Sequence, residues 1–269
     1  MSEFPLEVEY LSPWGDRWPL TSVEHRGVFI REGSLRSFMG DVERTAAAGF
    51  RGAGQRTTSL AVKPLEVGFT VCVVPGEEAE RLWLDWLRSW SYTSPGTLIV
   101  RNTSLGDVRM SVWLRGVGEP DQLTNGEQWW GGYPSVEMTV AADGGLWWAG
   151  PVASRPLPSA ASSQVVRVAN SGDWFVRPRV RWQGAGAAVT MPSGARVTLP
   201  TTTAPRSLIL DMSESCAVVD DSGVLDKGVW RRLAGGVVPE AVPPGGVREY
   251  RIEGRSQLLW RVPVLRPWR

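Results

Sequence analysis

The stretch "LEVGFTVCVVPGEEAERLWLDWLRSWSY", residues 65–92, changes its hydrophobic period once and so decides the fold of the first half of the chain. Its first part places apolar side chains at every second position, as a half-buried strand does: Leu65, Val67, Phe69, Val71 and Val73. After Pro75 the apolar residues recur at helical spacing instead: Ala79, Leu82, Trp83, Trp86, Leu87 and Trp90. We therefore expect a strand and then a helix over about residues 76–90. The core face of this helix is expected to carry Leu82, Trp83, Trp86, Leu87 and Trp90.

Strand-like alternation continues on both sides of this stretch, at residues 4–10, 108–114 and 136–140. Beyond residue 165, short strand candidates are separated by turn signals such as "NSGD", "MPSG" and "PPGG", a spacing typical of a β-sandwich. Between the two regions, "GPVASRPLPSAASSQ" is rich in Pro, Ser and Ala and shows no period. The sequence predicts a mainly β protein with a first domain at 1–149, a linker at 150–164 and a second domain at 165–269.

The segment "DVERTAAAGFRGAGQRT", residues 41–57, interrupts this alternation. It shows no strand period, and its alanines, glycines and single aromatic residue, Phe50, offer too little apolar surface for a core. It is also longer than most connections in a compact domain, which marks it as functional or disordered. Arg44, Arg51 and Arg56 supply donors suited to carboxylates and carbonyls on another surface. Two interpretations stand: a binding arm anchored by Phe50, and a plain surface loop.

Composition is that of a soluble globular protein. Of 269 residues 42% are apolar and 21% are charged, and the net charge of +1 lacks the basic excess of most nucleic-acid-binding domains. The start "MSEFPLEVEY" has no signal-peptide pattern and no apolar run approaches about 18 residues, so we expect neither secretion nor membrane insertion. Lys63 and Lys227 are the only lysines among 29 cationic residues, which we interpret as a trace of GC-rich coding DNA.

Two cysteines and one histidine limit the chemistry that the chain can support. Cys72 and Cys216 each lie in an apolar, strand-like run, so we expect two buried free thiols rather than a disulfide. His25 is expected as a polar residue at a strand edge, and a multi-histidine or thiolate metal site would need more ligands than the chain has. Nucleotide-binding glycine motifs in a strand-to-helix setting do not occur. We expect no metal and no cofactor.

Two carboxylate pairs would suit glycoside hydrolysis, but each has a simpler explanation. Asp220 and Asp221 are adjacent, and adjacent strand residues point to opposite faces. Glu77 and Glu78 fall in the first turn of the expected helix, where the helix dipole accounts for them. We therefore expect a protein that is not an enzyme and has no catalytic residues.

The order of parts resembles the distal tail protein family of siphovirus-type phages, which have long, non-contractile tails. The resemblance rests on "GVFIREG" leading into "GFRGAGQRT", the strand "LEVGFTVCV" running into the helix "EEAERLWLDWL", and the second-domain opening "NSGDWFVRPRVRWQG" with "SLILDM" behind it. It covers nearly the whole chain, although none of these motifs is a catalytic fingerprint. It implies a tail-tube-like β-barrel or sandwich with one amphipathic helix, followed by a galectin-like β-sandwich.

The same resemblance implies a structural virion component of the tail tip, made in the host cytoplasm. The predominance of arginine over lysine adds the expectation that this host has GC-rich DNA. Six subunits would form a ring that joins the tail tube protein to a tail-tip, tail-associated protein of the host-recognition apparatus. DNA would pass through the lumen without base readout. An arm at about residues 36–57, with Arg44, Phe50, Arg51 and Arg56 as contact residues, would be mobile in an isolated subunit and would lie along the neighbouring subunit of the ring.

The 15 tryptophans raise an alternative, a lectin-like module for host adsorption. Aromatic faces hold sugar rings in many proteins, so Trp174 and Trp230 in the second domain are candidate carbohydrate-binding residues. Trp182 alternates with arginines and is expected to face inward. Filling of cores and subunit contacts, where Trp is enriched, explains the same residues without a ligand, and we favour that explanation.

Overall fold

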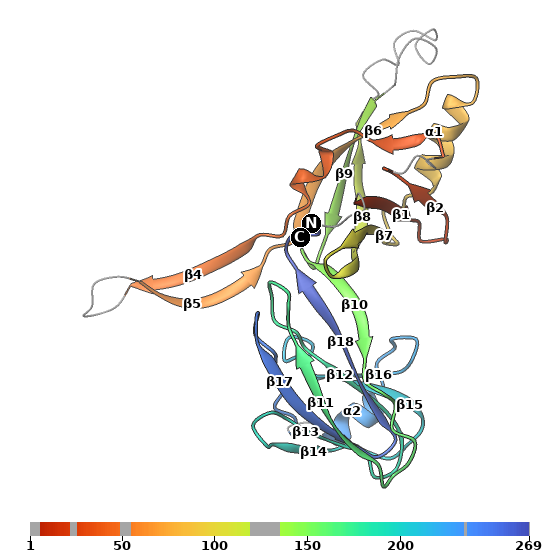
Figure 1. Ribbon diagram of the computed structural model, residues 1–269. Coiled ribbons are helices and arrows are strands. Elements are labelled where there is room, and N and C mark those ends of the chain that lie inside the picture. Colours follow the sequence, from red (N-terminus) through yellow and green to blue (C-terminus); the bar gives the residue numbers. More distant parts are fainter. Residues whose placement is uncertain (1–5, 22–25, 49–54, 119–134, 234–235, 269) are drawn as a thin grey trace. The chain divides into compact units, whose positions relative to one another are not determined.

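The computed structural model describes residues 6–21, 26–48, 55–118, 135–233 and 236–268. The chain divides into two compact units, one formed by Met1–Ala149 with Val264–Arg269 and the other by Gly150–Pro263. Both units consist mainly of antiparallel strands, which confirms the predicted fold class (Figure 1). In the predicted division the second domain runs to residue 269. In the structure Val264–Arg269 belong to the first unit instead.

In the first unit, two runs of paired strands share one long strand, β8 (Gly106–Val117). The first half of β8 pairs with β7 (Gly96–Thr103), and the order continues through β1 (Glu7–Leu11) to β2 (Arg17–Pro19). Its second half pairs with β9 (Ser135–Ala142), and the order continues through β6 (Leu65–Val73) to β3 (Val28–Ile30). A register shift between Leu114 and Gly116 lies in this second half, where an extra residue bends a strand. The strand β10 (Trp147–Ala153) pairs with the start of β8.

The predicted helix is α1 (Ala79–Arg88), which contacts β3 and β6. Trp83, Trp86 and Trp90 are buried, whereas Leu82 and Leu87 are half-buried. The Trp86 ring meets Tyr10, Trp18 and Trp90 edge to face, with centroids 5.5, 5.3 and 5.3 Å away. Tyr10 stacks on Trp90 at 3.8 Å, and its hydroxyl donates to the Ser89 carbonyl at 2.9 Å. Such aromatic pairs add to the stabilisation from burial, so this cluster attaches the helix to the sheet.

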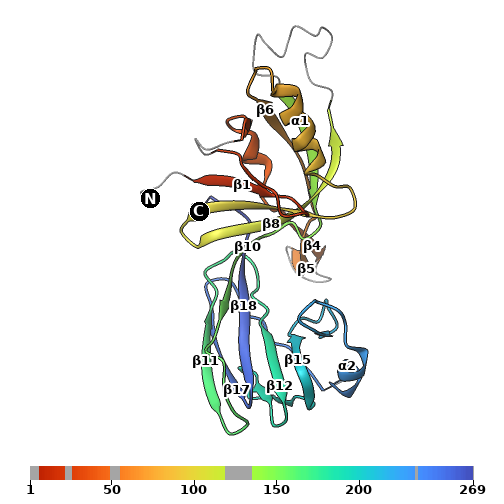
Figure 2. The ribbon, with the colours of Figure 1, turned by 90° about the vertical axis from the view of Figure 1, so that its right-hand side faces the viewer.

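The second unit is a sandwich of two antiparallel sheets (Figure 2). One sheet contains β11 (Ser163–Ala169), β17 (Val247–Glu253), β13 (Ala188–Thr190) and β14 (Arg196–Thr198) in this order. The other contains β16 (Val218–Val219), β15 (Thr202–Ile209), β12 (Arg179–Gly184) and β18 (Ser256–Val264) in this order. A short helix, α2 (Lys227–Leu233), follows β16. The core is formed by inward-facing residues of both sheets: Val166, Val168, Val180, Trp182, Val189, Leu208, Tyr250, Ile252 and Leu258.

Residues 150–164 differ from the expected free linker. Their first part belongs to β10, and β11 begins at Ser163. Between these strands the amides of Ser154 and Leu157 donate to the carbonyls of Leu258 and Ser256, both at 2.9 Å. Proline and serine do not prevent such pairing, because every residue except proline still offers a backbone amide. The second unit therefore begins at Gly150.

Cys72 and Cys216 are buried free thiols, as predicted. Burial raises the pKa of both thiols, which favours the protonated form over the reactive thiolate at neutral pH. Within the described residues, none of the helices has the length and hydropathy that crossing a membrane requires. His25 lies outside the described residues.

Candidate subunit interface

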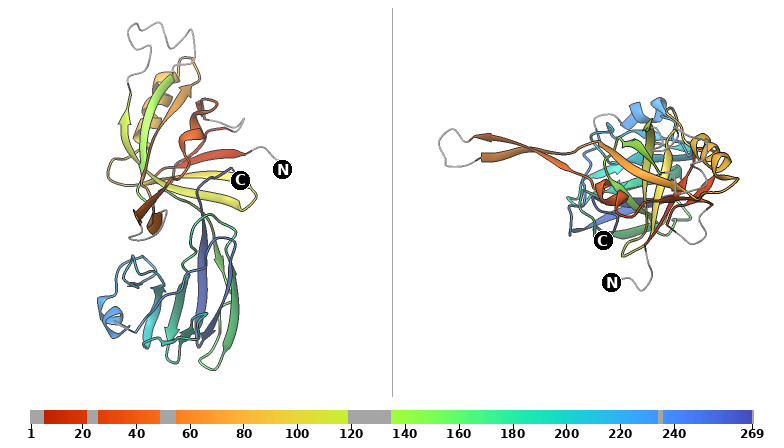
Figure 3. Two further views of the ribbon diagram at one scale, coloured as in Figure 1. Left: turned by 90° about the vertical axis from the view of Figure 1, so that its left-hand side faces the viewer. Right: turned by 90° about the horizontal axis from the view of Figure 1, so that it is seen from above.

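The segment that follows η1 (Ser34–Ser37) forms two paired strands, β4 (Val42–Ala48) and β5 (Gln55–Val62). They make a two-stranded sheet of their own, which we call the β4–β5 ribbon (Figures 1 and 3). The sequence pattern, which shows no strand period over residues 41–57, did not predict these strands. Backbone pairing does not require large apolar side chains, and a register shift between Thr45 and Ala46 breaks the alternation that would reveal a strand.

The β4–β5 ribbon is amphipathic next to its base. The cross-strand pairs Val42 with Val62 and Arg44 with Leu60 lie on one face, while Glu43 with Ala61 and Thr45 with Ser59 lie on the other. On the apolar face, Leu60 is 50% exposed and the two valines are half-buried. No other described strand pairs with β4 or β5. Because an isolated two-stranded sheet is marginally stable in water, a surface that covered this ribbon would stabilise it.

The two ends of the ribbon are joined to each other at its base, and this base packs against other parts of the first unit. Lys63 Nζ and Asp41 Oδ2 lie 2.9 Å apart, and the Lys63 amide donates to the Asp41 carbonyl at 2.9 Å. The Lys63 ammonium lowers the pKa of Asp41, and the Asp41 carboxylate raises the pKa of Lys63. Gly145, at φ 58°, packs so closely that an added Cβ would lie 2.0 Å from the Lys63 carbonyl oxygen. The Gly40 amide donates to the Leu265 carbonyl at 2.8 Å.

The four residues predicted to make the contacts of the arm lie in different surroundings, and two of them are outside the described residues. Arg44 is exposed, and its Nε donates to Thr57 Oγ1. Arg56 lies in β5 opposite Ala47, and its side chain is not described. Phe50 and Arg51 lie outside the described residues. Sequence reasoning ended the segment at Thr57 and missed the apolar face formed by Val42, Leu60 and Val62, although the alternation of Leu60 and Val62 signals a strand.

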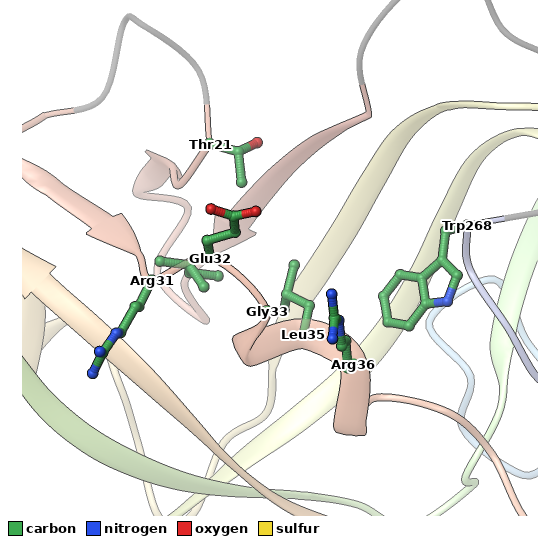
Figure 4. Close-up of a pocket in the computed structure, with 8 residues that line it drawn as sticks. Thr21, Arg31, Glu32, Gly33, Leu35, Arg36 and Trp268 are labelled. Atoms are coloured by element: carbon green, nitrogen blue, oxygen red, sulfur yellow. The ribbon is translucent and has the colours of Figure 1, made fainter.

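A pocket of about 420 Å³ lies beside η1, just before the ribbon in the chain (Figure 4). Ile30, Leu35 and Trp268 supply apolar surface, and the charged groups around it are Arg31, Glu32 and Arg36. Figure 4 shows Leu35 and Arg36 on η1, between Glu32 and Trp268. Among the described residues that line this pocket, Glu32 is the single carboxylate, whereas glycoside hydrolysis uses a pair of carboxyl groups.

The candidate sugar-binding tryptophans are both half-buried. Trp174 meets Phe175 edge to face at 5.5 Å, and its carbonyl accepts a hydrogen bond of 2.7 Å from the Asn170 amide. Trp230, on α2, donates its indole N–H to the Ser215 carbonyl at 3.0 Å. Trp182 is buried in the core, as its alternation predicts. Trp174 and Trp230 therefore belong to different elements, a loop and a helix, and each already makes contacts within its own region.

Comparison with known proteins gives matches among solved structures only. A scan against protein-family models and a search of curated proteins found no match. The fold is similar to that of the SPP1 Dit (gp 19.1) protein, described as a paradigm of the hub adsorption apparatus in phages that infect Gram-positive bacteria. Identity is 12% and the TM-score is 0.58, over 97% of this chain and 100% of that one.

Two further similar chains come from the phage P2 baseplate in its activated conformation, determined with Ca and with Sr. Identity is 10% in both cases, and the TM-scores are 0.53 and 0.52 over 96% of this chain and 98% of each of those. At such identities the likeness concerns the fold, and it extends over both units.

Proposed function

We propose that this protein is a structural component of a phage tail tip and that six copies form a ring. The first unit, similar to a tail-tube subunit, builds the ring, and the β4–β5 ribbon of each copy lies along the next copy. The second unit is a galectin-like sandwich. The ring joins the tail tube protein to a tail-tip protein of the host-recognition apparatus and leaves a lumen through which DNA passes.

The observation that carries this proposal is the uncovered apolar face of the ribbon. Leu60 exposes half of its surface, and β4 and β5 pair only with each other among the described strands. Burying such a face on a neighbouring copy removes apolar surface from water and pairs an open strand edge. The end-to-end likeness to the SPP1 Dit protein supports the tail-tip assignment, because that protein belongs to a hub adsorption apparatus.

Further parts of the proposal rest on composition and on the likeness to phage tail-tip proteins. With a net charge of +1, the protein would make sparse and nonspecific contacts to passing DNA. It has a structural role without catalysis, is made in the host cytoplasm and resides in the virion. The predominance of arginine over lysine supports a host with GC-rich DNA.

The test compares two leucine variants by sedimentation velocity. Leu60→Asp places a charge on the apolar face of the ribbon, and Leu225→Asp is the matched control, since Leu225 is 41% exposed in the second unit. We expect the parent and Leu225→Asp to form the same ring and Leu60→Asp to sediment as a folded monomer. Rings that form equally well in all three proteins would contradict the proposed role of the ribbon.

A further inference from the structure

A second pocket, of about 180 Å³, lies on the outer face of the β12–β18 sheet in the second unit. On β12, Arg181 and Gln183 alternate with the buried residues Val180 and Trp182, so they point away from the core. Gln257 on β18 stands directly opposite Arg181, and the Gln183 amide donates to the Arg255 carbonyl at 3.0 Å. Strand register therefore brings two guanidinium groups and two carboxamides to one pocket.

The charges at this pocket do not cancel. Asp221 holds Arg181 by two hydrogen bonds, of 3.0 Å to Nε and 2.7 Å to Nη2. Next to the pocket, Arg206 Nε is paired with Asp226 at 2.7 Å. Arg255 is exposed, and its side chain has no ion pair or hydrogen bond with any described residue. The pocket therefore keeps one uncompensated positive charge.

Both carboxamides are held in fixed orientations. Gln183 Nε2 donates to the Thr203 carbonyl and Gln257 Nε2 donates to the Ser154 carbonyl, each at 2.8 Å. Within the described structure, neither side-chain oxygen accepts a hydrogen bond from the protein. Since a carboxamide oxygen is an acceptor with two lone pairs, both oxygens are available to hydroxyl donors.

We propose that this pocket binds an anionic group carried on a hydroxyl-bearing unit, namely a phosphate or carboxylate on a sugar or polyol. Arg255 pairs with the anion, and Arg181, oriented by Asp221, offers its remaining N–H groups. The oxygens of Gln183 and Gln257 accept hydrogen bonds from the hydroxyls. The volume is below the range of about 300–1,000 Å³ for most ligand pockets, so it suits a single unit of a charged polymer.

This site is separate from the tryptophans that the sequence singled out, since neither Trp174 nor Trp230 lines it. It also differs from a site for neutral sugars, because the main contact to the ligand comes from an arginine cation and not from an exposed aromatic ring. Binding at the pocket requires only the second unit, so the inference does not depend on ring formation.

Isothermal titration of the full chain with four small probes tests the proposal: glycerol 3-phosphate, glucuronate, glycerol and glucose. Arg255→Ala removes the unpaired cation, and Arg167→Ala is the matched control, because Arg167 is an exposed arginine on β11. We expect one or both anionic probes to bind, and Arg255→Ala to weaken binding roughly tenfold or more while Arg167→Ala leaves it unchanged. The neutral probes should not bind at the same concentrations.

The two anionic probes separate the possible sources of the charge. Stronger binding of glycerol 3-phosphate indicates a phosphate-bearing polymer, and stronger binding of glucuronate indicates an acidic polysaccharide. Three results would overturn the proposal. The two arginine variants could lose binding equally, or neutral and charged probes could bind equally well. The third is that neither anion binds at tens of millimolar, on the order of the weakest site-specific affinities.

Discussion

Replacing Trp86 by alanine tests whether the aromatic cluster around α1 stabilises the first unit. The Trp86 side chain is fully buried against Tyr10, Trp18 and Trp90, and its indole N–H lies 3.0 Å from Met138 Sδ. Truncating a buried tryptophan to alanine costs about 3–5 kcal/mol, from lost burial and from the cavity left behind. Because domains are stable by only about 5–15 kcal/mol, this change removes a large share of the stability of the unit.

Hydrogen exchange followed by mass spectrometry is the suitable assay, because a two-unit protein need not unfold in one step. In Trp86→Ala, the free energy of the opening reaction that lets amides of β1 and β7 exchange should fall by about 3–5 kcal/mol. Amides of β12 and β17 should keep their protection. The matched control is Trp14→Ala, because Trp14 is 62% exposed in the same unit. Equal effects of the two substitutions, or a loss of less than about 1 kcal/mol in Trp86→Ala, would refute the reasoning.

Three further predictions concern the base of the ribbon and the thiols. In a denaturant titration, Gly145→Ala should lower the free energy of unfolding by more than about 1 kcal/mol, because Gly145 has a positive φ and an added Cβ would meet the Lys63 carbonyl. Gly144→Ala is the control and should be nearly neutral, because its added Cβ meets nothing within 4 Å. The pKa of Asp41, followed by NMR, should lie below the ordinary aspartate value and should return toward that value in Lys63→Met. The ion pair between Asp41 and Lys63 is complete above about pH 4 and is lost as the pH falls through the folded-state pKa of Asp41. Cys72 and Cys216 should not react with a thiol reagent at pH 8 in the folded protein and should both react in denaturant; fast labelling of the folded protein would be inconsistent with their burial.

The parts of the fold with a clear hydrophobic period could be predicted from the sequence. The alternation from Leu65 to Val73 became β6, and the helical spacing from Ala79 onward became α1, because in both cases one face had to be buried. The inward position of Trp182 followed from the same rule. These elements determine the two cores.

The candidate interface was harder to predict, because its signals are weak or non-local. Ala46 and Ala47 are small, and the register shift after Thr45 interrupts the alternation, so β4 has no strand period of its own. The assignment of Val264–Arg269 to the first unit depends on contacts between distant parts of the chain, such as that from Gly40 to Leu265, which no local pattern reveals. The pocket at Arg181 likewise arises from the register between β12 and β18.

Electron microscopy of the purified protein tests the central claim most directly. The ribbon supplies an apolar face and open strand edges that only a second surface can cover, so the protein should assemble with itself at micromolar concentration. The account predicts closed rings whose class averages have six-fold symmetry and a central lumen. Monodisperse monomers at high concentration, or open filaments without a closed ring, would contradict it.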